Sequence, residues 1–215
     1  MWYDYVTYNI TQNLTEFIIV RHPFERLVSA YRDKLERMNL FYYNKYGRKI
    51  VQRFREKAIQ TLGKDYFNKS NNYGTLLKAD DRHGNMPSFW EFVQAVMIKL
   101  NMDEHWIPMH VHCFVCHPTQ LKLHPYILKF ENLSEEGPAF VNHMGWEGKI
   151  NGSLQLNVNR SPEMSSQEIT QLYFSVLSED EIFKLYNVYK YDFILFDYKF
   201  DIGSISLPLD KIYEE

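Results

Sequence analysis

Residues 17–32 read FIIVRHPFERLVSAYR, and this stretch carries the clearest structural signal in the chain. The four apolar residues 17–20 indicate a strand covered on both faces, as in a parallel sheet. Pro23 suits the first turn of a helix, where its missing N–H has no intrahelical partner. The sequence therefore predicts an α/β fold in which a strand passes directly into an amphipathic helix. The apolar residues of that helix recur at helical spacing: Phe24, Leu27, Val28, Tyr31, Leu35 and Met38.

Arg21 and Ser29 are the candidate binding residues of this junction. Arg21 follows the strand, at the edge where open α/β sheets bind ligands, and the first N–H groups of the next helix attract anions. Ser29 comes roughly two helical turns later, offset by about 80° around the axis. A guanidinium group and a hydroxyl together suit a terminal phosphate. The alternative is that Arg21 pairs with Glu25 at the surface and that Ser29 is a small packing residue.

The same stretch resembles the 3′-phosphate-binding motif of the Golgi carbohydrate sulfotransferases, specifically the chondroitin, dermatan and HNK-1 sulfotransferase group. The resemblance implies a P-loop-like sulfotransferase fold with a parallel sheet core, in a single domain over residues 1–215. It also implies transfer of a sulfonate group from 3′-phosphoadenylyl sulfate to a hydroxyl of a glycan or proteoglycan. Further matches follow in order along the chain: DEHW at 103–106, Cys113 and Cys116, ILKFENL at 127–133, YFSVLS at 173–178, Leu185-Tyr186 and YDF at 191–193.

The resemblance also implies roles for individual residues. Arg21 and Ser29 match the positions that hold the 3′-phosphate of the donor. Arg160, in a late basic loop, is a candidate second contact to that phosphate, and the preferred alternative is an ordinary surface arginine beside a sequon. We expect His105 to be the general base, because an imidazole can accept the proton of the acceptor hydroxyl at neutral pH. Asp103 and Glu104 are candidates to orient His105 or to replace it. In the alternative reading, this segment is structural and Trp106 packs inward.

One motif of the family is missing from the chain. Members hold the 5′-phosphosulfate with a loop containing glycine and lysine, between a first strand and a first helix. The sixteen residues before Phe17 contain neither Gly nor Lys. We therefore expect an N-terminally incomplete sulfotransferase domain, or else a catalytically inactive relative that binds a glycan or a nucleotide.

Composition limits the remaining function classes. The chain of 215 residues is 45% hydrophobic and 16% aromatic, which is enough for one substantial core. Its net charge of −3 gives no overall attraction to anionic polymers, so we expect no nucleic-acid partner and a local patch for any acidic glycan. A helix near residues 45–58 is basic, and an ordinary solvated face is the preferred reading over a glycan groove. Its cationic residues are Lys45, Arg48, Lys49, Arg53, Arg55 and Lys57.

Localisation is an inference from the family. The chain has no run of eighteen apolar residues and no signal-like start, so membrane association is expected only through a segment absent from this chain. Family members are Golgi membrane proteins with a lumenal catalytic domain, and we expect the same location here. Asn-X-Ser/Thr sequons agree weakly with a lumenal origin. They begin at Asn9, Asn13, Asn68, Asn132, Asn151 and Asn159.

Cys113 and Cys116 are the two cysteines of the chain. In an oxidising lumen a local disulfide is the first expectation, and free thiols come next. Zinc is the alternative, because thiolate and imidazole form a suitable ligand set. A second Cys pair or spaced His pair is absent, so we expect no metal. The nearby imidazoles are His105, His110, His112 and His117.

Three further patterns predict architecture. Ser88 with Glu91 and Ser178 with Glu181 have the spacing of capping boxes, which open helices. Residues 126–130 indicate a short strand. Glu131, at the end of that strand, is either a ligand-facing residue or, preferably, an ordinary strand-terminal carboxylate.

Overall fold

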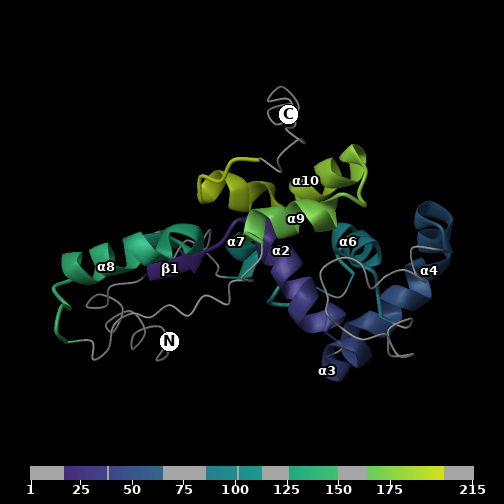
Figure 1. Ribbon diagram of the computed structural model, residues 1–215, viewed down its shortest axis with the longest axis horizontal. Coiled ribbons are helices and arrows are strands. Elements are labelled where there is room, and N and C mark those ends of the chain that lie inside the picture. Colours follow the sequence, from purple (N-terminus) through teal and green to yellow (C-terminus); the bar gives the residue numbers. More distant parts are fainter. Residues whose placement is uncertain are drawn as a thin grey trace, which may run out of the picture. The chain divides into compact units, whose positions relative to one another are not determined.

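The computed structural model describes residues 17–37, 39–64, 86–100, 102–112, 126–149 and 164–200. The chain divides into two compact units, shown as ribbons in Figure 1. They are named the strand unit and the helical unit. The strand unit comprises Met1–His22, Pro108–Asn159 and Tyr191–Tyr198, and the helical unit comprises Pro23–Ile107, Arg160–Lys190 and Lys199–Glu215.

The strand unit contains a parallel pair of strands. Phe17 lies opposite Tyr126 and Val20 lies opposite Lys129, so both strands end at the same edge. This pairing confirms the α/β class and the parallel sheet predicted from the sequence. The described elements of this unit are β1 (Phe17–Val20), α7 (Met109–His112), β2 (Tyr126–Lys129), the 3-10 turn η4 (Phe130–Asn132) and α8 (Leu133–His143).

Helix α8, which lies beside β1 in Figure 1, packs on β2 and contacts both strands through Phe140. The Phe140 ring lies 5.2 Å from the ring of Phe17 and 5.3 Å from that of Tyr126, centroid to centroid. The expectation that β1 is covered on both faces is wrong. Phe17 and Ile19 remain 48% and 41% exposed, and Ile127 of β2 remains 43% exposed. Within the described residues, the narrow two-stranded sheet is packed against a single short helix.

The helical unit begins at Pro23, which is the first residue of α2 as predicted. Beyond Tyr31 the helix continues as a π-type turn, so Leu35 still points into the core and is fully buried. The described elements of this unit are α2 (Pro23–Tyr31), η1 (Arg32–Glu36), α3 (Leu40–Tyr42), η2 (Tyr43–Gly47), α4 (Arg48–Leu62), α6 (Phe89–Met97), α9 (Ser166–Phe174) and α10 (Glu179–Leu195), which enters the strand unit at Tyr191.

Both predicted capping boxes are confirmed. At the start of α6, the Glu91 N–H donates to Ser88 Oγ at 3.3 Å and the Ser88 N–H donates to Glu91 Oε2 at 2.6 Å. Ser178 and Glu181 make the same reciprocal pair before α10. A third box, Ser165–Glu168, opens α9 and was not predicted. Each box satisfies two N–H groups that a helix start leaves without intrahelical partners.

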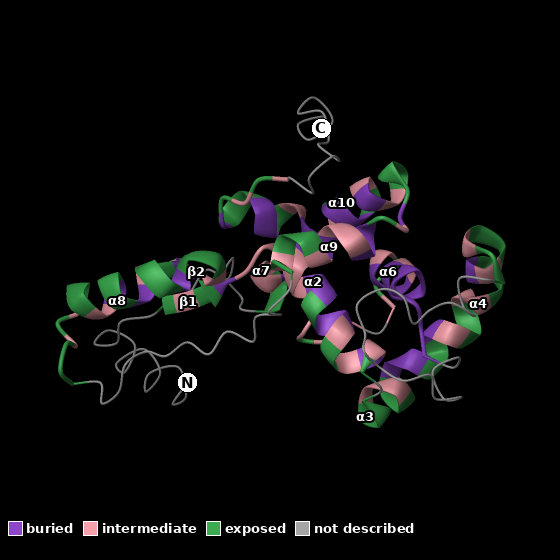
Figure 2. Ribbon diagram, viewed as in Figure 1, coloured by how far each residue is buried: buried purple, intermediate pink, exposed green. Residues whose placement is uncertain are grey.

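An aromatic core holds the helices of this unit together. Helix α2 packs against α9, where the rings of Phe24 and Phe174 lie 4.8 Å apart. Helix α4 packs against α6, which is buried along most of its length (Figure 2). Packing on this scale fixes the elements that carry the candidate site. The largest fully buried side chains of the unit include Trp90, Trp106, Tyr189, Phe24, Phe89, Phe92 and Phe174.

The basic segment forms α4, and most of its charges face solvent as predicted. Ile50 and Ala58 are buried on the inner face, whereas Arg48, Lys49 and Arg53 are exposed. Arg55 departs from this expectation because its guanidinium group forms an ion pair with the buried Glu91. In the part of the chain that the structure describes, no helix combines the length and the apolar character needed to span a membrane.

Candidate functional site

His105 lies in a turn that Trp106 anchors in the helical unit. The Trp106 side chain is 1% exposed, and its ring packs edge-on against those of Phe92 and Tyr46. The N–H groups of Trp106 and Ile107 donate to the Asp103 carbonyl at 3.0 and 2.7 Å. Burial of Trp106 therefore holds the turn in place while the His105 side chain stays 32% exposed.

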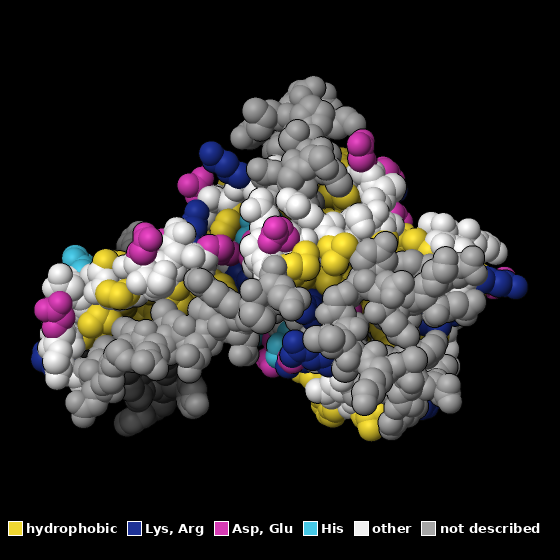
Figure 3. All heavy atoms as spheres, in the orientation of Figure 1, with side chains coloured by type: hydrophobic (Ala, Val, Ile, Leu, Met, Phe, Trp, Pro, Cys, Tyr) yellow, Lys and Arg dark blue, Asp and Glu magenta, His cyan; other side chains and the backbone are white. Residues whose placement is uncertain are grey.

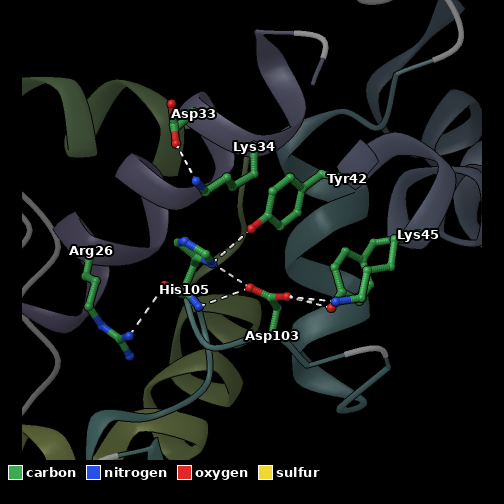
Figure 4. Close-up of polar contacts among 8 residues, drawn as sticks. Arg26, Asp33, Lys34, Tyr42, Lys45, Asp103 and His105 are labelled. Atoms are coloured by element: carbon green, nitrogen blue, oxygen red, sulfur yellow. Dashed lines mark hydrogen bonds and ion pairs between the residues drawn. The ribbon is translucent and has the colours of Figure 1, made fainter. Parts of the chain in front are cut away.

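Asp103 orients the His105 ring (Figure 4). Nδ1 of His105 lies 2.6 Å from Asp103 Oδ1, and the His105 backbone N–H donates to the same oxygen at 3.2 Å. A carboxylate partner places the ring proton on Nδ1, so Nε2 carries the lone pair. Among the described residues, none forms a hydrogen bond with Nε2. The ring is therefore arranged to accept a proton at Nε2.

The other carboxylate oxygen of Asp103, Oδ2, is also held by neighbouring side chains. The Tyr46 hydroxyl donates to Oδ2 at 2.5 Å, and Lys45 Nζ lies 3.6 Å from it. Burial raises the pKa of Asp103, but the hydrogen bonds from Tyr46 and His105 outweigh it and bring the pKa below its usual value. Burial and the bond to Asp103 raise the pKa of Tyr46. Asp103 is therefore ionised at neutral pH, and Tyr46 keeps its proton.

Tyr42 and two lysines complete the surroundings of His105. The Tyr42 ring stands edge-on to the His105 ring at 5.6 Å, and its hydroxyl oxygen is 3.4 Å from Nδ1. Lys34 belongs to η1, and its Nζ lies 5.1 Å from the Tyr42 ring centroid and 2.8 Å from Asp33 Oδ2. Figure 3 shows cationic side chains gathered beside a histidine and acidic groups near α2. His105 therefore lies among side chains of both signs, in which Lys34 pairs with Asp33 and Lys45 with Asp103.

Glu104, the second candidate base, has no such support. Its side chain is exposed, and within the described residues no hydrogen bond or ion pair holds its carboxylate. A general base needs a fixed position relative to the proton that it accepts. Between His105 and Glu104, the geometry favours His105.

Arg21 lies where the sequence placed it, just beyond the end of β1. Its guanidinium carbon lies 5.0 Å from the ring centroid of Phe130, which follows the end of β2. Glu131 accepts hydrogen bonds from the His22 N–H at 2.7 Å and from the Tyr198 hydroxyl at 2.9 Å. Glu131 thus fastens the two strand ends to each other, as an ordinary strand-terminal carboxylate does.

Ser29 is exposed on α2, so the alternative that it is a packing residue is wrong. Ser29 and His105 belong to the helical unit, and Arg21 belongs to the strand unit. The shared binding of one phosphate by Arg21 and Ser29 therefore stays a prediction.

Several predicted residues lie outside the described part of the chain. These are Arg160, the pair Cys113 and Cys116, and His117. Of the sequons, Asn132 alone is described, and its side-chain amide donates to Glu136 at 3.0 Å. Among the described residues, no three His, Cys, Asp or Glu side chains are placed to hold a metal ion.

Sequence reasoning missed three residues of the site: Arg26, Tyr42 and Tyr46. Arg26 donates to the carbonyl of His105 at 3.4 Å and to that of Ile107. Tyr42 and Tyr46 are four residues apart and so share one side of their helical segment. That spacing is the one local sequence signal that could have grouped Tyr42 with Tyr46.

The chain belongs to the Sulfotransferase family, which it matches over residues 2–199. It is 31% identical over 191 residues to carbohydrate sulfotransferase 11 of Rattus norvegicus, a match that covers 85% of this chain and 46% of the relative. Carbohydrate sulfotransferase 8 of Mus musculus is 28% identical over 202 residues, which cover 93% of this chain and 42% of the relative. Carbohydrate sulfotransferase 9 of Homo sapiens is 26% identical over 194 residues, which cover 89% of this chain and 39% of the relative. The chain thus spans less than half the length of these relatives, and no solved structure is significantly similar to it.

Proposed function

We propose that this chain transfers a sulfonate group from 3′-phosphoadenylyl sulfate to a hydroxyl of a glycan, with His105 as the general base. The observation that carries the proposal is the pairing of His105 Nδ1 with Asp103 at 2.6 Å, which turns Nε2 into a proton acceptor. Membership of the Sulfotransferase family supports the reaction class. The names of the relatives, carbohydrate sulfotransferases, support a carbohydrate acceptor, and we propose the Golgi lumen as the location from the family resemblance alone.

The proposed reaction exchanges one sulfur–oxygen bond for another. The acceptor oxygen forms a bond to sulfur while the bond from sulfur to the bridging phosphate oxygen breaks, and 3′,5′-diphosphoadenosine leaves. The acceptor proton moves to Nε2 of His105. The resulting imidazolium is stabilised by the ionised Asp103 beside Nδ1. A positioned base of this kind typically contributes about 10²–10⁴-fold to the rate.

Donor binding is proposed for three cationic or hydroxyl side chains. Arg21 and Ser29 would hold the 3′-phosphate, and Arg160 would add a second positive charge. The exposed position of Ser29 on α2 supports its part in this site. Hydrogen bonds to charged groups contribute about 1.5–3 kcal/mol each, so the loss of Arg21 should be readily measured.

Transfer of radiolabelled sulfonate to a panel of chondroitin, dermatan and other glycan acceptors tests the reaction. We expect His105→Gln to reduce transfer by about 10²-fold or more, since it removes the base. Glu104→Gln is the matched control and should retain wild-type transfer. If Glu104→Gln abolished transfer and His105→Gln did not, the role of base would pass to Glu104.

Calorimetric titration with 3′,5′-diphosphoadenosine tests donor binding separately. Arg21→Ala should weaken binding by about tenfold to a hundredfold, which corresponds to the loss of one charge-assisted contact. Arg53→Ala, an exposed arginine of α4, should leave binding unchanged. Unchanged affinity in Arg21→Ala would refute the donor assignment. Nucleotide binding without transfer in the wild-type chain would favour a catalytically inactive relative.

A further inference from the structure

Three successive backbone carbonyls of the turn that carries His105 accept hydrogen bonds from side chains of other elements. Arg26 donates through Nη1 to the His105 carbonyl at 3.4 Å and through Nη2 to the Ile107 carbonyl. The carbonyl between them, that of Trp106, accepts the Tyr189 hydroxyl. One guanidinium group and one phenol thus cap the whole segment 105–107.

The two donors come from rigid parts of the helical unit. Arg26 projects from α2, whose neighbouring residues Phe24 and Leu27 are 0% and 1% exposed. Tyr189 lies on α10 and is itself 0% exposed. A guanidinium group has a planar fork of donors, so it can bind two carbonyls at once with little freedom to rotate. The turn is therefore attached to two packed helices rather than to a regular backbone ladder.

This attachment determines where the His105 ring can lie. Asp103 fixes the orientation of the ring and is itself held by Tyr46 of η2, but these contacts act on side chains and leave the backbone carbonyls of residues 105–107 to other partners. The bonds from Arg26 and Tyr189 reach the segment from outside. A displacement of a catalytic group by about 1 Å can lower the reaction rate strongly, so the segment that carries a base needs contacts with other elements to hold it in place.

We propose that Arg26 and Tyr189 are positioning residues that hold the His105 turn in the geometry needed for proton transfer. The inference rests on the proposed role of His105 as base. It adds a function for Arg26, which lies between Arg21 and Ser29 in the sequence: this arginine joins α2, the helix that carries Ser29, to the turn that carries His105.

The first test does not require sulfonate transfer. In the full chain, the reaction of His105 with diethyl pyrocarbonate is followed by peptide mass spectrometry, with the exposed His112 as internal reference. Arg26→Gln and Tyr189→Phe should each change the rate at His105 relative to His112. Arg48→Gln, at an exposed position of α4, should not. An unchanged rate at His105 in both variants would overturn the proposal, whether or not the chain proves to be an enzyme.

The second test measures steady-state transfer. Arg26→Gln should lower kcat by about tenfold to a hundredfold, the effect of a displaced base, and leave KM for the donor nearly unchanged. Arg26→Lys should restore part of the loss, because an ammonium group can reach one carbonyl at a time. A rise in KM with unchanged kcat would assign Arg26 to donor binding and overturn the positioning role. If Arg26→Gln does not fold, as judged by circular dichroism, Tyr189→Phe decides, because it removes a single oxygen atom.

Discussion

Arg55 donates two parallel hydrogen bonds to Glu91, from Nε to Oε1 at 2.8 Å and from Nη2 to Oε2 at 3.1 Å. Glu91 is completely buried, and its carboxylate also accepts the Ser88 N–H that begins α6. Arg55 in turn donates to the Met86 carbonyl at 2.7 Å. A single ion pair therefore closes the start of α6 and attaches α4 to it.

Removal of Arg55 should destabilise the fold strongly. Arg55→Met leaves the buried Glu91 charge without its cation, which typically costs about 3–5 kcal/mol in the free energy of unfolding. Urea unfolding measures the loss. Lys49→Met, at an exposed position of the same helix, is the matched control and should change stability by no more than about 0.5 kcal/mol. A similar small change in Arg55→Met would contradict the bidentate pair.

Tyr46→Phe should weaken the His105 site without altering its packing. The substitution removes the hydroxyl that donates to Asp103 Oδ2 at 2.5 Å, and a hydrogen bond to a charged group contributes about 1.5–3 kcal/mol. The free energy of unfolding at neutral pH should fall by an amount in this range. Tyr43→Phe, in the same helical segment, is the control. Equal stability of the two variants would show that the bond to Asp103 contributes nothing.

The contribution of Asp103 should depend on pH in a defined direction. Its folded-state pKa lies below the usual value, so the native state favours the ionised form. The stability that this carboxylate contributes is fully present above the unfolded-state pKa and is lost as the pH falls through the lowered folded-state pKa. The difference in unfolding free energy between the wild-type chain and Asp103→Asn should therefore shrink on acidification. A difference that stays constant down to acid pH would contradict this linkage.

Glu36 should show the opposite dependence on pH. Burial raises its pKa, although the hydrogen bond from Tyr173 and the charge of Arg32 lower it in part. The folded state therefore binds the proton more tightly than the unfolded state does. Protonation of Glu36 therefore stabilises the folded state, and the free energy of unfolding rises as the pH falls through the raised folded-state pKa. The gain is complete below the unfolded-state pKa.

Glu36→Gln removes this titration and keeps an oxygen that accepts from Tyr173. We expect the variant to be more stable than the wild-type chain at neutral pH and to lose the advantage in acid. Thermal unfolding of both proteins between neutral and acid pH measures this difference in stability. Glu104→Gln, which alters an exposed carboxylate, provides the comparison. Identical pH profiles for Glu36→Gln and the wild-type chain would rule out the raised pKa.

The elements that the sequence predicted correctly are those with local signals. Pro23 sets its own backbone angle and lacks an N–H, so it marks the start of α2 without help from the rest of the fold. Ser88 and Glu91 satisfy each other's backbone N–H groups across a single turn. The end of β1 and the position of Arg21 follow from the same short stretch.

What the sequence did not predict depends on residues far apart in the chain. The bond from Tyr46 to Asp103 spans 57 positions, and that from Arg26 to His105 spans 79. No periodic pattern encodes such pairs, because tertiary packing brings them together. The apolar residues of β1 suggested burial on both faces, but hydrophobicity alone does not say how many elements cover a sheet.

The pairing of β1 with β2 has a consequence for the order of folding. His22 and Glu131, whose hydrogen bond closes the ends of the strands, are 109 positions apart, whereas each capping box joins residues three positions apart. Closing a long loop costs conformational entropy before its contacts form, so distant parallel pairing is intrinsically slow. The helices that the capping boxes open, α6, α9 and α10, can therefore form early, and the strand end that carries Arg21 is expected to reach its native shape among the last parts of the molecule.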